Sequence, residues 1–269
     1  MDNNYQTYFG FKKQPFSSDL NMEEILLTDE LQSVKKRFDY AVELGGIALI
    51  TGDIGSGKST ALRYASEALH SSEYKVFYVT ATSGPILELY RQIMDEMGIL
   101  GIGRSKAAMT SNIRREIREI VDAKRMKAVL VIDEASLLRL DVIAELHTLT
   151  QFHKDSKPWL PVILAGQSML VDKLMYRTSA PLASRVITRS HLEGLNLDGM
   201  KQYIDHHLEL AGANTSLFDD PAITAVHQGS GGLLRKSNHL ARGALMAAAL
   251  SQAQTINADH VRLAATEIF

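Results

Sequence analysis

Short runs of hydrophobic residues alternate with longer amphipathic stretches through the first two thirds of the chain. Continuous hydrophobic runs, biased toward Val and Ile, lie at residues 47–50, 75–79, 128–132 and 161–166. Such runs are typical of strands that are covered on both faces of a sheet. Between them, the stretches 85–97 and 109–123 place hydrophobic residues at helical spacing. The alternation predicts an α/β fold with a doubly wound parallel sheet.

The pattern changes near residue 197, after which helical stretches follow one another to the end of the chain without a strand-like run. Ahead of the first strand, an aromatic, turn-like opening leads to hydrophobic residues at helical spacing in 31–42. We therefore expect three parts. These are an N-terminal lead-in at 1–44 that packs on the core, an α/β domain at 45–196 and a small C-terminal helical lid domain at 197–269.

The segment GDIGSGKST lies between the first predicted strand and a predicted helix, and it satisfies the pattern G-x-x-x-x-G-K-[ST]. Glycines let backbone N–H groups and the following helix N-terminus approach phosphate oxygens closely. Lys58 would reach the β and γ phosphates, and the Ser59 hydroxyl would bind Mg²⁺. A glycine-rich turn is the alternative, but the strand, loop and helix stand in the order that nucleotide binding requires. The expected ATP-binding residues are Gly52, Asp53, Ile54, Gly55, Ser56, Gly57, Lys58, Ser59 and Thr60.

Two adjacent carboxylates follow the third predicted strand, in the segment AVLVIDEAS. Asp133 is expected to hold Mg²⁺, and Glu134 to orient and polarise the water that attacks the γ phosphate. In isolation the pair would be interpreted as a helix N-cap with a solvated neighbour. A phosphate loop about 75 residues upstream favours the catalytic interpretation.

Four further polar residues stand where they could act on the same nucleotide. Gln167 ends the next strand, either as a sensor of the γ phosphate or as a strand-end cap. Arg185 and Arg189 are surface charges or candidates for an arginine finger that projects into a neighbouring subunit's nucleotide. Arg235 lies in the first turn of a predicted helix, where a cation opposes the helix dipole, and this conflict suggests a contact with nucleotide.

The composition narrows the class of protein. The chain has 269 residues, of which 45% are hydrophobic and 22% charged, as in ordinary globular proteins. It contains no cysteine, which excludes disulfides, thiolate zinc sites and cysteine nucleophiles. Neither a secretion signal nor an apolar run of membrane-spanning length is present, so we expect a cytoplasmic protein without a membrane partner.

The formal net charge of −2 gives no overall attraction to nucleic acid, so DNA binding would need a local basic patch. The segment 101–118 offers one, with only Glu116 opposing its cations. Its alternative is a solvated loop and polar helix face. The expected DNA-contacting residues are Arg104, Lys106, Thr110 and Arg114, with Arg115 beside them.

Several segments in order resemble one group of proteins. YFGFKKQPFSSD, LITGDIGSGKST, VLVIDEAS, ILAGQ, LASRVITRSHLEGL and SGGLLRKSNHLA together resemble the ExeA-type AAA+ ATPases, a group similar to the transposition ATPases TniB, TnsC and MuB. The resemblance implies a P-loop AAA+ fold that uses ATP and Mg²⁺. It also implies that residues 52–60 are Walker A, Asp133 and Glu134 are Walker B, and Gln167 is sensor one. By the same resemblance Arg185 is the candidate finger, Arg235 is sensor two, and QPF lines the adenine side.

Secretion-type members of that group carry a membrane span and a peptidoglycan-binding part after the ATPase, whereas this sequence ends at AATEIF. We therefore expect a stand-alone ATPase that forms homo-oligomers on double-stranded DNA and directs a transposase to its target. The alternative is a cytoplasmic ATPase of a secretion or envelope-assembly complex that acts on protein partners. A third hypothesis, a nucleotide switch with negligible turnover, is disfavoured by Glu134.

Overall fold

The computed structural model describes residues 4–99, 105–213 and 216–266, and its chain divides into two compact units. The sheet unit comprises Asp29–Gly52 and Lys58–Leu192. The helical unit comprises the chain up to Thr28, the short segment Asp53–Gly57 and the chain from Glu193 onward. Each unit has its own hydrophobic core.

The sheet unit is built on five parallel strands in the order β2-β3-β4-β1-β5. The runs predicted from sequence form the first four strands, and the parallel α/β fold is confirmed. Residues 128–132 are fully buried, as expected of a strand covered on both faces. The strands are β1 Ile47–Gly52, β2 Tyr74–Thr80, β3 Lys127–Asp133, β4 Val162–Gly166 and β5 Val186–Leu192.

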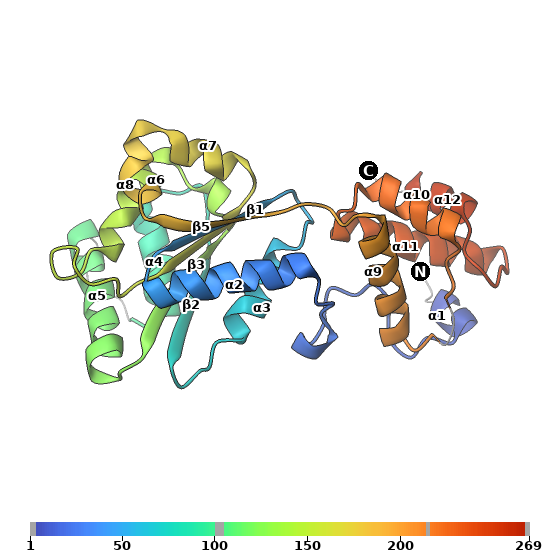
Figure 1. Cartoon of the computed structure of the whole chain (residues 1–269), viewed down its shortest axis with the longest axis horizontal. Helices are drawn as coiled ribbons and strands as arrows, with labels where there is room; N and C mark the ends of the chain where they lie inside the picture. The colour runs from blue at the N-terminus through green and yellow to red at the C-terminus, as the bar shows by residue number, and fades with distance from the viewer. Residues whose placement is uncertain (1–3, 100–104, 214–215, 267–269) are drawn as a thin grey trace. The chain divides into compact units, whose positions relative to one another are not determined.

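Helices cover both faces of this sheet (Figure 1). One face packs on α2 and α3, which contact β1 and β4. The other contributes alternate strand residues to a core shared with α4, α5, α6 and α7. The helices of this unit are α2 Asp29–Leu44, α3 Lys58–Glu67, α4 Ile86–Glu96, α5 Lys106–Arg118, α6 Leu140–Leu146, α7 Met169–Met175 and α8 Ala180–Ala183. Short single turns also occur, namely η2 Glu119–Ala123, η3 Ala135–Leu137, η4 His147–Thr150 and η5 Arg177–Ser179.

The helical unit packs around α11, which contacts α1, α10 and α12. Side-chain caps start several of its helices; the Asp219 carboxylate, for example, accepts a hydrogen bond of 2.7 Å from the Ala222 N–H at the start of α10. The elements are α1 Asn4–Phe9, η1 Met22–Glu24, α9 Leu197–Leu210, α10 Asp220–Ser230, α11 Leu234–Leu250 and α12 Ala258–Ala265.

Two features of the fold differ from the sequence interpretation. Residues 186–192 form a fifth strand that sequence analysis did not predict, because the sequence VITRSHL of this edge strand contains four consecutive polar residues. The expected lead-in also divides between the units. Tyr5 and Phe16 are buried in the helical core, whereas α2 packs on the sheet.

The turn between α2 and β1 generates a prediction about stability. Gly45 has φ of +68°, and a Cβ there would lie 2.0 Å from the Pro158 carbonyl oxygen. Gly98 has a similar φ of +72° with nothing within 4 Å of its Cβ position. Gly98→Ala should therefore lower the free energy of unfolding by about 1 kcal/mol, the cost of a left-handed backbone in alanine. Gly45→Ala should cost about 1–3 kcal/mol more, because the backbone must shift.

Urea unfolding followed by the fluorescence of Trp159, the single tryptophan, measures both variants in the sheet unit. Equal losses in the free energy of unfolding would show that the Pro158 backbone can shift without a loss of stability.

Candidate active site

The loop from the end of β1 to the start of α3 has the backbone that an anion cradle needs. Gly55 and Gly57 have φ of +84° and +99°, which other residues rarely adopt. A Cβ at Gly55 would lie 2.8 Å from the Arg235 Cβ. The helix α3 starts at Lys58, the residue after the loop, and the N–H groups and positive dipole end of a helix N-terminus favour anions.

The other loop residues lie around this cradle. The Asp53 carbonyl accepts a hydrogen bond of 3.1 Å from the Ser56 N–H, and the Ile54 side chain is exposed. Thr60 is exposed on the first turn of α3. Ser56 is only 5% exposed, and its hydroxyl has no hydrogen-bonding partner within the described part of the chain. A buried polar atom without a partner costs free energy, so the loop is suited to a polar ligand.

Lys58 is buried to 7% exposure, and its ammonium donates to the Gly52 carbonyl oxygen over 2.9 Å. A buried ammonium is costly unless it has partners. The Gly52 carbonyl therefore holds this cation at the end of β1.

Asp133 ends β3 and accepts three hydrogen bonds in the sheet unit. Its Oδ2 accepts the hydroxyl of Ser59 at 2.9 Å and the hydroxyl of Tyr78 at 2.7 Å, and its Oδ1 accepts the Glu134 N–H at 2.8 Å. Ser59 and Asp133 are the pair that sequence analysis assigned to Mg²⁺, and the sheet brings them together. Hydroxyl and carboxylate oxygens are among the ligands that Mg²⁺ prefers.

Tyr78 is a site residue that sequence analysis missed. Burial, followed by the hydrogen bond and charge of Asp133 and the charge of Glu134, raises the pKa of Tyr78, so the phenol stays protonated and donates. The only sequence signal was a tyrosine hydroxyl within the hydrophobic run of β2. The strand register that brings this hydroxyl to Asp133 could not be predicted from the sequence.

Glu134 has a left-handed backbone, with φ of +51°, and immediately precedes the turn η3. Such conformations cost free energy in residues other than glycine and are enriched at functional sites. Lys173 of α7, also missed from sequence, secures the turn. Its ammonium donates to the carbonyls of Ser136 and Leu138, each over 2.7 Å.

Gln167 follows β4, the strand between β1 and β3, and is half-buried. Its carbonyl accepts a hydrogen bond of 2.9 Å from the Leu170 N–H at the start of α7. The residue therefore stands at the same edge of the sheet as Asp133. Its role as sensor stays a prediction.

Arg185 forms an ion pair with Asp155 at 2.6 Å and donates to the Pro181 carbonyl at 2.5 Å. Its carbonyl also accepts the Ile47 N–H, so its backbone is fixed at the start of β1. Arg189 is exposed on β5. Either arginine stays a candidate for the finger.

Arg235 is exposed in the first turn of α11, and its backbone N–H donates to the Gly55 carbonyl over 3.2 Å. This hydrogen bond and the short Cβ approach at Gly55 bring the start of α11 to the glycine loop. A nucleotide contact by the guanidinium stays a prediction.

The expected DNA-contacting residues lie on α5, apart from Arg104, which is outside the described residues. Lys106 is exposed and forms an ion pair of 2.8 Å with Glu145. Arg114 is half-buried and donates to the Thr148 carbonyl, whereas Thr110 is half-buried on the same helix. The exposed cations of this helix are Lys106, Arg115 and Arg118.

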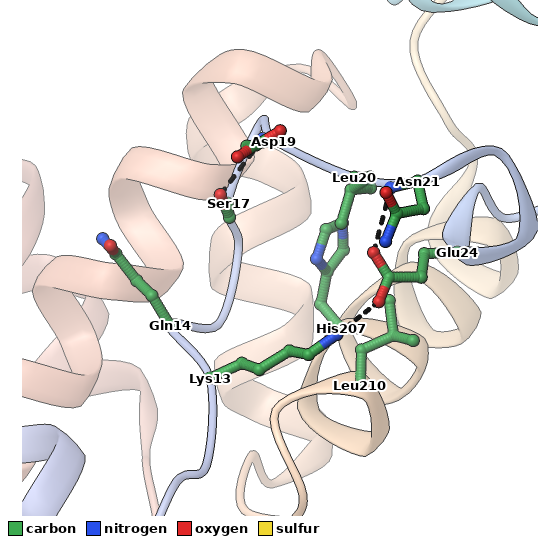
Figure 2. A pocket seen from close by; sticks show the side chains of 9 residues that line it. All are labelled: Lys13, Gln14, Ser17, Asp19, Leu20, Asn21, Glu24, His207 and Leu210. Carbon is green, nitrogen blue, oxygen red and sulfur yellow. Dashed lines mark hydrogen bonds and ion pairs between the residues drawn. The ribbon is translucent and has the colours of Figure 1, made fainter.

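A polar cavity of about 290 Å³ lies in the helical unit, between residues 13–24 and α9 (Figure 2). The ion pair of Lys13 with Glu24, at 2.5 Å, lies on its lining. Burial, and then the charge of His206, lowers the pKa of His207 to about 4, so this buried imidazole is neutral at pH 7. Of the QPF segment, Gln14 lines the cavity and Phe16 is buried against His207.

Comparison with known proteins begins with a family model. Residues 42–174, which span the phosphate loop and both carboxylates, match the model described as AAA domain. General secretion pathway protein A of Aeromonas hydrophila is 28% identical over 265 residues, which cover 98% of this chain and 48% of that protein. The chain thus spans about half the length of the curated relative that it matches.

Solved structures share the fold at low sequence identity. Cdc6p of Pyrobaculum aerophilum superposes with a TM-score of 0.73 at 14% identity, over 94% of this chain and 70% of that one. The ORC1 protein of Aeropyrum pernix, solved in complex with DNA, gives 0.69 at 17% identity, over 94% and 68%. The RuvB Holliday junction branch migration motor of Thermotoga maritima gives 0.54 at 19% identity, over 88% and 69%.

Within the described ranges, no helix combines the length and apolar character needed to cross a membrane.

Proposed function

We propose that this chain, which has the AAA+ fold, is an ATPase that hydrolyses ATP with Mg²⁺ in the cytoplasm. In this proposal it acts as a homo-oligomer on double-stranded DNA, where it regulates target selection by a transposase. The observation that carries the chemistry is the 2.9 Å hydrogen bond from Ser59 to Asp133. It joins the end of the phosphate loop to the carboxylate pair at one edge of the sheet.

Each residue of the site has a distinct task in this proposal. The backbone N–H groups of the glycine loop and the ammonium of Lys58 bind phosphate oxygens. Ser59 and Asp133 hold Mg²⁺, which when bound neutralises charge that develops on the phosphates. Glu134 orients the attacking water and polarises it.

Three further residues complete the site at its borders. Gln167 senses the γ phosphate from the end of β4. Arg185 acts on the nucleotide of a neighbouring subunit, where its charge stabilises the transition state. Arg235 contacts the nucleotide from the start of α11.

The proposed DNA surface is the basic side of α5. The ion pair of Lys106 with Glu145 has side chains that are 51% and 43% exposed. Such pairs contribute about 0–1 kcal/mol, so Lys106 can exchange its partner for a DNA phosphate. A few cations on each subunit of an oligomer add their weak contacts along one duplex. The ORC1 protein of Aeropyrum pernix, which shares this fold at 17% identity, was solved in complex with DNA.

The second candidate function is an ATPase of a secretion or envelope-assembly complex with protein partners. It is favoured by the match to General secretion pathway protein A, which extends over nearly the whole of this chain. The two candidates share the ATPase chemistry. They differ in whether the ATP-bound oligomer binds DNA.

Lys58→Ala and Glu134→Gln should separate nucleotide binding from hydrolysis. Loss of the Lys58 charge should abolish detectable ATP binding, because that charge acts on the ground-state phosphates. Glu134→Gln should bind ATP normally and turn it over about 10²–10⁴ times more slowly, as expected for loss of a general base. Calorimetry and phosphate release measure the two effects, with Glu43→Gln on the exposed side of α2 as the control. Turnover by Glu134→Gln at the wild-type rate would show that another residue activates the water.

Arg185→Ala should leave ATP affinity intact and lower turnover by about 10³-fold or more, since a finger acts on the transition state. Asp155→Asn is the matched variant, because it removes the ion pair but keeps the arginine. Its turnover should not fall.

Mixing tests whether Arg185 acts across subunits. Arg185→Ala subunits keep an intact nucleotide site, and Lys58→Ala subunits keep the finger, so their mixture should regain activity. A mixture that assembles normally but stays inactive would exclude Arg185 as the finger, and Arg189 would be tested next. Equal losses in Asp155→Asn and Arg185→Ala would instead indicate that the ion pair is structural.

Binding of DNA of arbitrary sequence, with ATP present and at several salt concentrations, tests the DNA surface. If Arg104 and Lys106 each contact one phosphate, the double alanine variant should weaken binding and make the slope of log K against log salt shallower by about 1.8. Lys201→Ala is the matched control, because Lys201 is an exposed, ion-paired lysine of the helical unit.

Nucleotide binding should be unchanged in both variants. An unchanged salt slope would place the DNA surface elsewhere on the chain. An assembled, ATP-bound protein that binds no DNA would favour the secretion candidate.

A further inference from the structure

The hydrogen bond of Tyr78 to Asp133 comes from a strand that takes no part in the nucleotide motifs. Tyr78 lies in the middle of β2, and its register partner on β3 is Val131, two residues before Asp133. Tyr78 and Asp133 therefore lie on the same face of the sheet, because alternate strand residues share a face. A tyrosine side chain is long enough to reach a diagonal position on the neighbouring strand. The Tyr78 hydroxyl lies 2.7 Å from Oδ2 of Asp133.

The donors around Asp133 come from different elements of the sheet unit. Oδ2 accepts one hydroxyl from α3 and one from β2, and Oδ1 accepts the N–H of the next residue. An ionised carboxylate has about four acceptor positions, so these three bonds leave one on Oδ1. Rotation of the carboxylate about its side-chain torsions would break the hydrogen bonds to both Ser59 and Tyr78.

We propose that Tyr78 is a positioning residue for the Mg²⁺ site. Its hydroxyl holds the Asp133 carboxylate in the orientation that accepts the Ser59 hydroxyl and leaves the free position of Oδ1 for the metal or its water. The inference rests on the proposed function, since it assigns Ser59 and Asp133 to Mg²⁺. Partners of this kind outside the ligand shell typically change metal affinity by about 10–100-fold when they are removed.

A purely structural bond between β2 and β3 is the competing explanation. The strands are already joined by a parallel register of seven residue pairs, from Tyr74 with Lys127 to Thr80 with Asp133. Loss of one hydroxyl should leave that pairing intact. The two explanations therefore differ in whether the Mg²⁺ dependence changes.

Tyr78→Phe tests the proposal, because it removes the hydroxyl and keeps the ring. The matched control is Tyr74→Phe, which removes a hydroxyl from the same strand, where the ring lies against Lys127 instead. Both changes are made in the Glu134→Gln background, so that hydrolysis does not interfere. Binding of a fluorescent ATP analogue is measured first in EDTA and then as Mg²⁺ is added.

Tyr78→Phe should bind the analogue in EDTA as its parent does and should need about tenfold more Mg²⁺ for the half-maximal change. Tyr74→Phe should match its parent in both measurements. If Tyr78→Phe lowers only the free energy of unfolding, with the Mg²⁺ midpoint within twofold of the parent, the hydroxyl is structural and the proposal fails.

Asp133→Asn in the same assay distinguishes this failure from failure of the proposed function. A large shift in Asp133→Asn without one in Tyr78→Phe would overturn only the role of Tyr78. An unchanged Mg²⁺ midpoint in Asp133→Asn would overturn the Mg²⁺ site itself, and with it the inference.

Discussion

The parallel pairing of β4 with both β3 and β1 is the constraint on which the site depends. Thr51 of β1 pairs with Gly166 of β4, and Leu164 of β4 pairs with Ile132 of β3. All three strands point the same way, so their carboxyl ends meet at one edge. This edge holds the start of the phosphate loop, Asp133 and Gln167, although more than 100 residues separate the first from the last. A different strand order would leave Ser59 and Asp133 without their hydrogen bond.

The sequence predicted strands β1 to β4 well and the edge strand β5 poorly. The β1, β3 and β4 segments are buried on both faces, and such burial requires continuous hydrophobic runs that are easily recognised. In contrast, β5 pairs with β1 alone and exposes alternate residues. Its sequence VITRSHL therefore resembles a polar connection. The opening of the chain was equally hard to place, because the partners of Tyr5 and Phe16 lie about 200 residues away, in the C-terminal helices.

The candidate site also contains residues that could be predicted from the sequence and residues that could not. Lys58, Ser59, Asp133 and Glu134 could be named from sequence, because phosphate and metal chemistry restricts the residue types at fixed spacings. Tyr78, Lys173 and Asp155 could not. Their contacts with Asp133, with the turn η3 and with Arg185 arise from strand register and tertiary packing. A motif thus identifies which atoms meet the ligand, whereas the fold decides which other atoms hold them.

The two hydrogen bonds of Lys173 have a mechanical consequence. The helix α7 begins two residues after Gln167, and η3 begins one residue after Glu134. One ammonium on α7 clamps two carbonyls of the segment that contains η3, so displacement of either element strains the same two hydrogen bonds. The chain segments that follow β3 and β4 are therefore mechanically coupled. A displacement near Gln167 would move the segment that follows Glu134, without a change in the sheet.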